Sequence, residues 1–187
     1  MPKAKQKHNV YVGLDLSLTA TGVVAVSNGT VDQQQLIKTK PPANSSYTTE
    51  VIRIKYIVEQ IRTGILLAAP SLVAIEGMAF MVRNATALVQ LSGLNYMVRS
   101  MLVDLDIPFI IVAPPSLKKF VTGSGKAQKD QMMLETYKRW NVTFMDNNLC
   151  DAHGLAQLAS AAMGEKTIEL NQEQREVVTL LEKQLSI

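Results

Sequence analysis

The sequence predicts an α/β fold in which helices flank a mixed five-stranded sheet, with three antiparallel strands followed by parallel ones. The first observation is a set of short apolar runs of strand length. They lie at residues 10–16, 21–27, 30–38, 72–76 and 108–112. The second is that short polar turns join the first three runs, whereas segments of helical period separate the later ones. The later strands must therefore join the sheet through helical crossovers.

The first three runs are expected to form an antiparallel meander. A polar turn at residues 17–20 joins the first two, and Asn28-Gly29 lies between the second and the third. Asn-Gly is a strong signal for a tight hairpin turn, because both positions tolerate a positive φ. Three consecutive strands connected in this way can only pair with alternating direction.

A helical period extends over residues 47–67, where Val51, Ile54, Ile61 and Ile65 mark one apolar face, and Pro70 ends it. Further helices are predicted at residues 86–105, from Pro114 onward, and at 128–139, 148–163 and 172–185. This order of strands and helices is that of the ribonuclease H-like fold. We expect residues 1–187 to form one such domain, with a basic flexible N-terminus at 1–9 and a C-terminal helical extension at 165–187.

The composition limits the class of protein. Hydrophobic residues make up 47% of the chain and charged residues 19%, which excludes a disordered protein. No apolar run approaches the roughly 18 residues that a membrane span needs, so no membrane partner is expected. Cys150 is the only cysteine, which excludes an internal disulfide and predicts a reducing, cytoplasmic environment.

The basic residues are concentrated in one segment. Residues 114–140 carry six basic side chains and two acidic ones, a net +4, whereas the whole chain carries +3. This distribution favours a polyanion bound at one face, and a solvated helix surface is the plainer alternative. The six are Lys118, Lys119, Lys126, Lys129, Lys138 and Arg139.

Three acidic residues stand at the ends of apolar elements. Asp15 lies in the run 10–16, Glu76 ends the run 72–76, and Asp151 opens the helix 148–163. A buried carboxylate without a cation costs several kcal/mol. An all-oxygen set suits Mg²⁺ or Mn²⁺, and three carboxylates can hold two ions about 4 Å apart. The three residues therefore predict a metal site, although three unrelated acids at element ends would give the same pattern.

The pattern of the helix 148–163 predicts which way the Asp151 side chain points. Residues 151, 155, 158 and 162 share one helical face, which is apolar after Asp151 and is expected to lie on the sheet. Asn148 precedes Asp151 by three residues and lies on the same face, whereas His153 is expected to point away from the site.

Four segments, in matching order, resemble the RuvC-type Holliday-junction resolvases, which are crossover junction endodeoxyribonucleases. They are Val12-Gly13-Leu14-Asp15-Leu16-Ser17 with Thr21-Gly22, Ala74-Ile75-Glu76 with residues 80–85, the basic segment 118–131, and Asp151-Ala152 running into Gly154-Leu155-Ala156. The resemblance covers about residues 10–163 and is compatible with a phage-type member from a bacterial or phage-infected cell.

The resemblance implies a homodimer that resolves four-way DNA junctions by paired symmetric nicks in DNA recombination and repair. It implies Mg²⁺, or Mn²⁺ as substitute, with two ions per site held by the catalytic residues Asp15, Glu76 and Asp151. Asn148 stands where relatives carry a fourth acid, so it is a further candidate ligand. The implied DNA-binding residues are Phe80, as a wedge at the junction centre, and Arg83, Lys118, Lys119, Lys126 and Lys129.

Several alternatives remain open at this point. A ribonuclease H-like enzyme or a broader branched-DNA nuclease would use the same chemistry. Asn148 leaves room for a junction-binding protein with weakened catalysis. A sugar-kinase or actin-like ATPase would need two phosphate loops, and the chain offers only the faint likeness at Gly13-Leu14-Asp15. Phe80 could also be a core side chain. The helix 86–105 is apolar on more than one face, so it could be a buried helix or a dimer contact.

Overall fold

A mixed five-stranded sheet forms the centre of the molecule, as predicted. The computed structural model describes residues 9–44, 46–78, 85–165 and 167–185. Within them the strand order is β3-β2-β1-β4-β5. β1 pairs antiparallel with β2 and β2 with β3, while β4 pairs parallel with both β1 and β5. The strands are β1 (Val10–Asp15), β2 (Ala20–Ser27), β3 (Thr30–Lys38), β4 (Leu72–Glu76) and β5 (Phe109–Val112).

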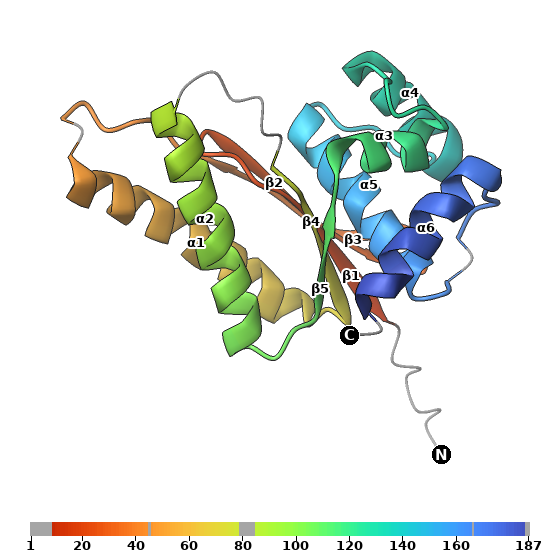
Figure 1. The fold of residues 1–187 in the computed structure, drawn as a ribbon, viewed down its shortest axis with the longest axis horizontal. Coiled ribbons are helices and arrows are strands. Elements are labelled where there is room, and N and C mark those ends of the chain that lie inside the picture. The colour runs from red at the N-terminus through yellow and green to blue at the C-terminus, as the bar shows by residue number, and fades with distance from the viewer. Residues whose placement is uncertain (1–8, 45, 79–84, 166, 186–187) are drawn as a thin grey trace.

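Helices cover both faces of this sheet. One face carries the helices α1 and α2, and the other carries α3 to α6, which form a thicker layer (Figure 1). The helices are α1 (Tyr47–Ala68), α2 (Ala85–Asp104), α3 (Pro114–Thr122), α4 (Lys129–Trp140), α5 (Asn147–Ala162) and α6 (Gln172–Leu185). Every predicted helix is present, and the bounds differ from those predicted by single residues. None of the helices in the described part of the chain has the length and hydropathy needed to span a bilayer.

Strand alternation decides which side chains face which layer. Leu14 and Ile75 are fully buried in the core under α1 and α2, whereas Tyr11 and Ala74 belong to the core under α5. Because successive side chains of a strand point to opposite faces, the next residue in each strand points toward α5. Asp15 and Glu76 therefore share the α5 face of the sheet.

Two glycines let α5 lie directly on that face. A Cβ atom at Gly13 would stand 1.9 Å from the backbone oxygen of Ala152, and one at Gly22 would stand 2.2 Å from that of Asn148. No side chain can occupy either position while the helix stays where it is. α5 is covered by α3, α4 and α6 on its outer side, so its residues are buried on nearly every face. The helix that carries Asp151 is therefore held on all sides.

Substituting Gly13→Ala should test this contact. The added methyl group must push α5 away from β1, and overpacking of this kind costs about 2–3 kcal/mol. The matched control is Gly64→Ala inside α1, where the new Cβ has no neighbour nearer than 3.5 Å. There the loss of a helical glycine should stabilise the protein by about 0.5–1 kcal/mol. Urea unfolding of both variants measures the two changes, and equal free energies of unfolding would contradict the close contact.

Candidate active site

Three carboxylates meet where the parallel strands end. Leu14 is level with Ile75 in the β1–β4 register, so Asp15 and Glu76 follow side by side at the carboxyl ends of these strands. Asp15 is 8% exposed. Asp151 comes from the second turn of α5, above the β1–β2 pair in which Gly22 is the partner of Asp15. The three acids come from distant parts of the chain and share one end of the sheet.

Burial and mutual repulsion perturb all three groups. Burial is the main cause that raises the pKa of Asp15, and the charges of Glu76 and Asp151 add to it. Burial also raises the pKa of Glu76, with a further contribution from Asp151. Burial raises the pKa of Asp151 to about 6. Without a cation, these carboxyl groups resist becoming charged together.

The Asp15 and Glu76 carboxyl groups also share a hydrogen bond, which favours the protonated form of Asp15 and the ionised form of Glu76. Two buried carboxyl groups that raise each other's cost of ionisation occupy a place where a hard cation would let both ionise. The donor chemistry therefore fits Mg²⁺ or Mn²⁺. Across the described segments, however, no three His, Cys, Asp or Glu side chains already surround one common point as ligands. The arrangement suits an ion held by one or two carboxylates with water and phosphate oxygens, as Mg²⁺ prefers, rather than a closed protein cage.

Two lysines flank the carboxylates. Lys118 belongs to α3 and lowers the pKa values of Glu76 and Asp151, whereas Lys129 begins α4 and lowers those of Asp15 and Asp151. A turn brings the two lysines to the same end of the sheet. Gly123 ends α3 with φ +82°, and a Cβ at Gly125 would stand 3.2 Å from the oxygen of Pro115 at the start of α3. The chain therefore doubles back beside α3 before α4 starts.

Asn148 lies near this centre but is already bonded. Its backbone N–H and its side-chain Nδ2 both donate to Oδ1 of Asp146, at 2.9 and 2.8 Å. Asp146 is the N-cap of α5. The side-chain oxygen of Asn148 is left for other partners, and its role as a metal ligand stays a prediction.

The other predicted DNA-binding residues do not all gather at this site. The Nζ of Lys119 lies 3.0 Å from Glu176 of α6, so Lys119 faces α6 rather than the carboxylates. Lys126 is exposed in the connection between α3 and α4. Phe80 and Arg83 lie outside the described residues.

The buried cysteine and histidine of α5 belong to the core. Cys150 contacts the Thr136 hydroxyl at 3.4 Å. The His153 ring packs against Trp140 and Phe144, with centroids 5.2 and 5.3 Å apart, and burial lowers its pKa to about 4. His153 therefore lies among aromatic rings on the outer side of α5, in the direction that the helical spacing predicts.

The chain matches a known protein family over most of its length. Residues 11–156 match the sequence model of the family described as crossover junction endodeoxyribonuclease RuvC. The chain belongs to the RuvC family. The matched span includes the three carboxylates, Lys118 and Lys129. No curated protein shows significant similarity to the chain.

Solved structures carry the same fold. RuvC of Thermus thermophilus is 20% identical with a TM-score of 0.68, covering 83% of this chain and 96% of its own. The same protein in complex with a Holliday junction substrate is 21% identical with a TM-score of 0.70, and the match covers 84% of this chain and 97% of that one. The yeast mitochondrial Holliday junction resolvase is 10% identical with a TM-score of 0.58, and the match covers 92% of this chain and 80% of that one. These likenesses confirm the ribonuclease H-like fold predicted from the order of elements.

Arg53 was not found by sequence reasoning. Its Nε donates to the Thr39 hydroxyl at 2.9 Å, and its guanidinium also donates to the backbone oxygen of Leu18. Burial lowers its pKa. Arg53 thus fastens the turn that follows β1, directly after Asp15, to the connection between β3 and α1. The same helical segment also carries Lys55, Glu59 and Arg62, so nothing in the sequence distinguishes Arg53 from them.

The raised pKa values predict how the metal-free protein responds to pH. A carboxyl group whose pKa is higher in the folded than in the unfolded state contributes stability at low pH. That contribution is lost as pH rises through the folded pKa. With a chelator present, the free energy of unfolding should fall as pH rises from about 5 to about 8. Asp15→Asn should flatten this decline and leave the variant more stable than the wild type at about pH 8.

Urea unfolding at the two pH values measures both effects. Asp32→Asn, at an exposed position on β3, removes one negative charge outside the carboxylate group and should leave the decline intact. If Asp15→Asn destabilised the metal-free protein at both pH values, that result would contradict the view that burial and mutual repulsion make the ionised Asp15 unfavourable.

Proposed function

We propose that this crossover junction endodeoxyribonuclease nicks opposed strands of a four-way DNA junction by hydrolysis dependent on a divalent cation, with Asp15, Glu76 and Asp151 as the catalytic carboxylates. The observation that supports this is the buried Asp15–Glu76 pair, with Asp151 close enough to repel both. Enzymes of this family generally depend on divalent metal ions. We propose that residues 1–187 form one nuclease domain, located in the cytoplasm of a bacterial or phage-infected cell.

The three carboxylates would hold Mg²⁺ or Mn²⁺, two ions per site in our proposal. Bound ions would supply an activated water and neutralise charge on the leaving 3′ oxygen. The chain's own residues prepare the site for this role. Asp15 is fixed in a central strand, Glu76 is held beside it by the strand register, and Asp151 is held by the rigid helix α5. Such fixed placement on regular elements is what catalytic positioning requires.

Branched DNA is the proposed partner, in line with the neighbouring Thermus structure solved with a Holliday junction substrate. Lys118 and Lys129 would draw a phosphodiester toward the carboxylates, because each offsets their negative charge. Lysine–phosphate contacts release counterions, so binding should weaken with salt. Lys126, Lys119, Phe80 and Arg83 stay predicted DNA contacts.

We also propose a homodimer formed through α2. The side chains of Val98, Met101 and Leu102 on α2 are buried in the core against the sheet. A different stripe is exposed. Val89, Tyr96 and Val103 recur every seven residues on the outer side of α2, with exposed fractions of 70%, 66% and 63%. A helix face that exposes three large apolar side chains in line suits a second copy of the same helix.

Asn148 supports one further candidate, a junction-binding protein with weakened catalysis. Its amide nitrogen is held by Asp146, and an asparagine oxygen adds no charge to a metal site. This candidate shares the substrate of the main proposal and differs from it in the rate of nicking.

Nicking of a labelled four-way junction tests the proposal. In Mg²⁺ or Mn²⁺ the wild type should release paired symmetric nicks, and Asp15→Asn, Glu76→Gln and Asp151→Asn should each slow nicking by about a thousandfold or more. Each variant should still bind the junction without divalent ions, because each removes a negative charge from a phosphate-binding site. Asp32→Asn serves as the control and should nick normally.

Other outcomes would separate the alternatives. Binding by the wild type without nicking in either metal would favour the junction-binding protein. Equally fast nicking of flaps, forks and four-way junctions would favour a broader branched-DNA nuclease. Full activity of the Asp15→Asn variant would contradict the proposed site.

The dimer contact is tested by a charge on the α2 stripe. Tyr96→Glu should raise the dimer dissociation constant at least about tenfold, because it places a carboxylate in a desolvated apolar contact. Tyr137→Glu on α4, at a position that is 51% exposed, is the matched control. Sedimentation velocity of both variants measures the change. A dimer that is unaffected by Tyr96→Glu would place the contact elsewhere.

A further inference from the structure

The C-terminal helix α6 lies outside the matched family region, which ends at residue 156. It packs against α3, α5 and β5. Its own side chains Val177, Val178 and Leu181 are buried in the core. Apolar packing alone would make it a stabilising cover. Its polar contacts are more specific, because they reach the helix that carries Lys118.

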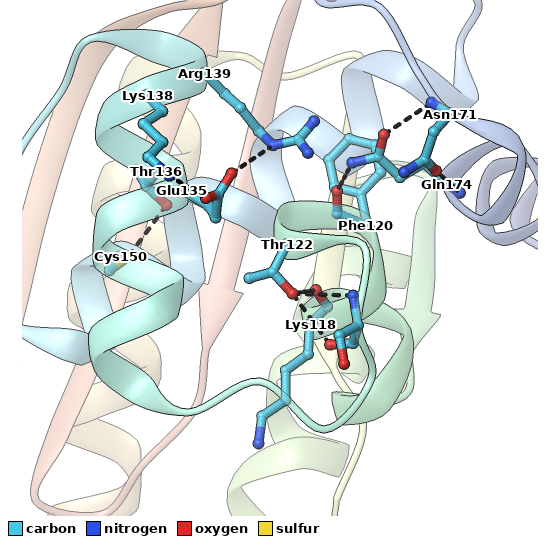
Figure 2. A network of polar contacts seen from close by, with 11 residues as sticks. Lys118, Phe120, Thr122, Glu135, Thr136, Lys138, Arg139, Cys150, Asn171 and Gln174 are labelled. Atoms are coloured by element: carbon cyan, nitrogen blue, oxygen red, sulfur yellow. Dashed lines mark hydrogen bonds and ion pairs between the residues drawn. The ribbon is translucent and has the colours of Figure 1, made fainter.

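Gln174 forms the main polar contact between α6 and α3. It is 1% exposed, and both halves of its amide are used. Its Oε1 accepts from the backbone N–H of Asn171 at 3.0 Å, and its backbone N–H donates to Oδ1 of Asn171 at 2.9 Å. These reciprocal bonds cap the N-terminus of α6. Its Nε2 donates to the backbone oxygen of Phe120 in the last turn of α3. Figure 2 shows Gln174 between Asn171 and Phe120.

The end of α3 depends on this bond. A helix leaves its last carbonyl groups without partners inside the helix, and a helix of nine residues is marginal by itself. Thr122 donates through its hydroxyl to the oxygen of Lys118 at 2.9 Å, and the N–H of Gly123 donates to that of Lys119 at 2.8 Å. The Phe120 oxygen receives its donor from α6. Each of these three carbonyls is thus satisfied, and one of them only by tertiary contact.

The other end of α6 holds the strand that leads into α3. Gln184 accepts from the N–H of Ile111 and donates to the oxygen of the same residue, both at 3.0 Å. Its side-chain amide therefore pairs with the open edge of β5 as a neighbouring strand would. β5 ends at Val112 and α3 begins at Pro114. Val112 is the register partner of Glu76. α6 thus contacts the chain on both sides of Val112, at Ile111 in β5 and at Phe120 in α3.

We propose that α6 is a positioning element of the active site, in which Gln174 and Gln184 fix α3 and so hold Lys118 beside Glu76 and Asp151. Gln174 is a positioning residue, since it acts through α3 and touches none of the carboxylates. The side chain of Lys118 extends from α3, and no dashed line joins its ammonium group to another residue in Figure 2, so its direction depends on the helix that bears it. The inference rests on the proposed role of Lys118 at the site.

The test is a double-mutant cycle on nicking. Gln174→Glu keeps an acceptor for Asn171 but removes the donor to Phe120, and Gln174→Met removes the donor without adding charge. Gln172→Glu, two residues away at an exposed position of α6, is the matched control. In single-turnover nicking of a four-way junction with Mg²⁺, each Gln174 variant should be on the order of tenfold slower than Gln172→Glu. In a Lys118→Ala background the same substitutions should cause almost no further loss.

A purely structural role would slow nicking by the same factor in both backgrounds, and that result would overturn the inference. Hydrogen exchange of the amides of α3 gives an independent measurement. Both Gln174 variants should exchange faster there than Gln172→Glu, and unchanged exchange would also overturn it. If Gln174→Glu fails to fold, Gln174→Met carries both measurements. Normal nicking by Lys118→Ala alone would instead contradict the proposed role of Lys118, and the exchange result would still decide whether α6 holds α3.

Discussion

The direct contact between α5 and the central strands is the constraint on which the rest of the structure depends. Gly13 and Gly22 have no side chains, and the backbone of α5 fills the space that a Cβ would take. This closeness brings Asp151 to the end of the sheet where Asp15 and Glu76 lie. It also fixes the outer layer, because α3, α4 and α6 pack on the far side of the same helix. A shift of α5 would therefore disturb the carboxylate group and the helices that carry the flanking lysines together.

Close packing of this kind has an electrostatic cost. Three acids in a poorly hydrated site repel one another, and their raised pKa values express that cost. Lys118 and Lys129 offset part of it from two neighbouring helices. Neither lysine lies on an element that carries one of the acids, so the balance of charge depends on the tertiary fold. In our proposal the bonds that close the end of α3 affect the site for this reason, even though none of them contacts a carboxylate.

The sequence alone was sufficient for the order of elements, and it singled out the three acids that the structure brings close together. Strand alternation and helical period are local properties, and a charged residue in an apolar run stands out without any knowledge of the fold. Other features were hidden because they depend on contacts between distant residues. Nothing near Lys119 in the sequence indicates that it pairs with Glu176, whereas Lys118 faces the acids. The donors from Gln174 and Gln184 were equally hidden, since a glutamine in an amphipathic helix usually faces solvent. Phe80 and Arg83 fall outside the described residues, so their predicted roles stay predictions.

The two layers of the molecule leave different surfaces for association. An open sheet edge is a ready partner for another strand, but on β5 the N–H and C=O of Ile111 are already paired with Gln184. Extension of the sheet across that edge is therefore hindered. The exposed apolar stripe of α2 lies in the opposite layer from α5 (Figure 1). Pairing through α2 would use a surface that contains none of the three carboxylates and neither flanking lysine. A dimer formed in this way would leave the carboxylate end of each sheet open to DNA, as two sites acting on opposed strands of one junction require.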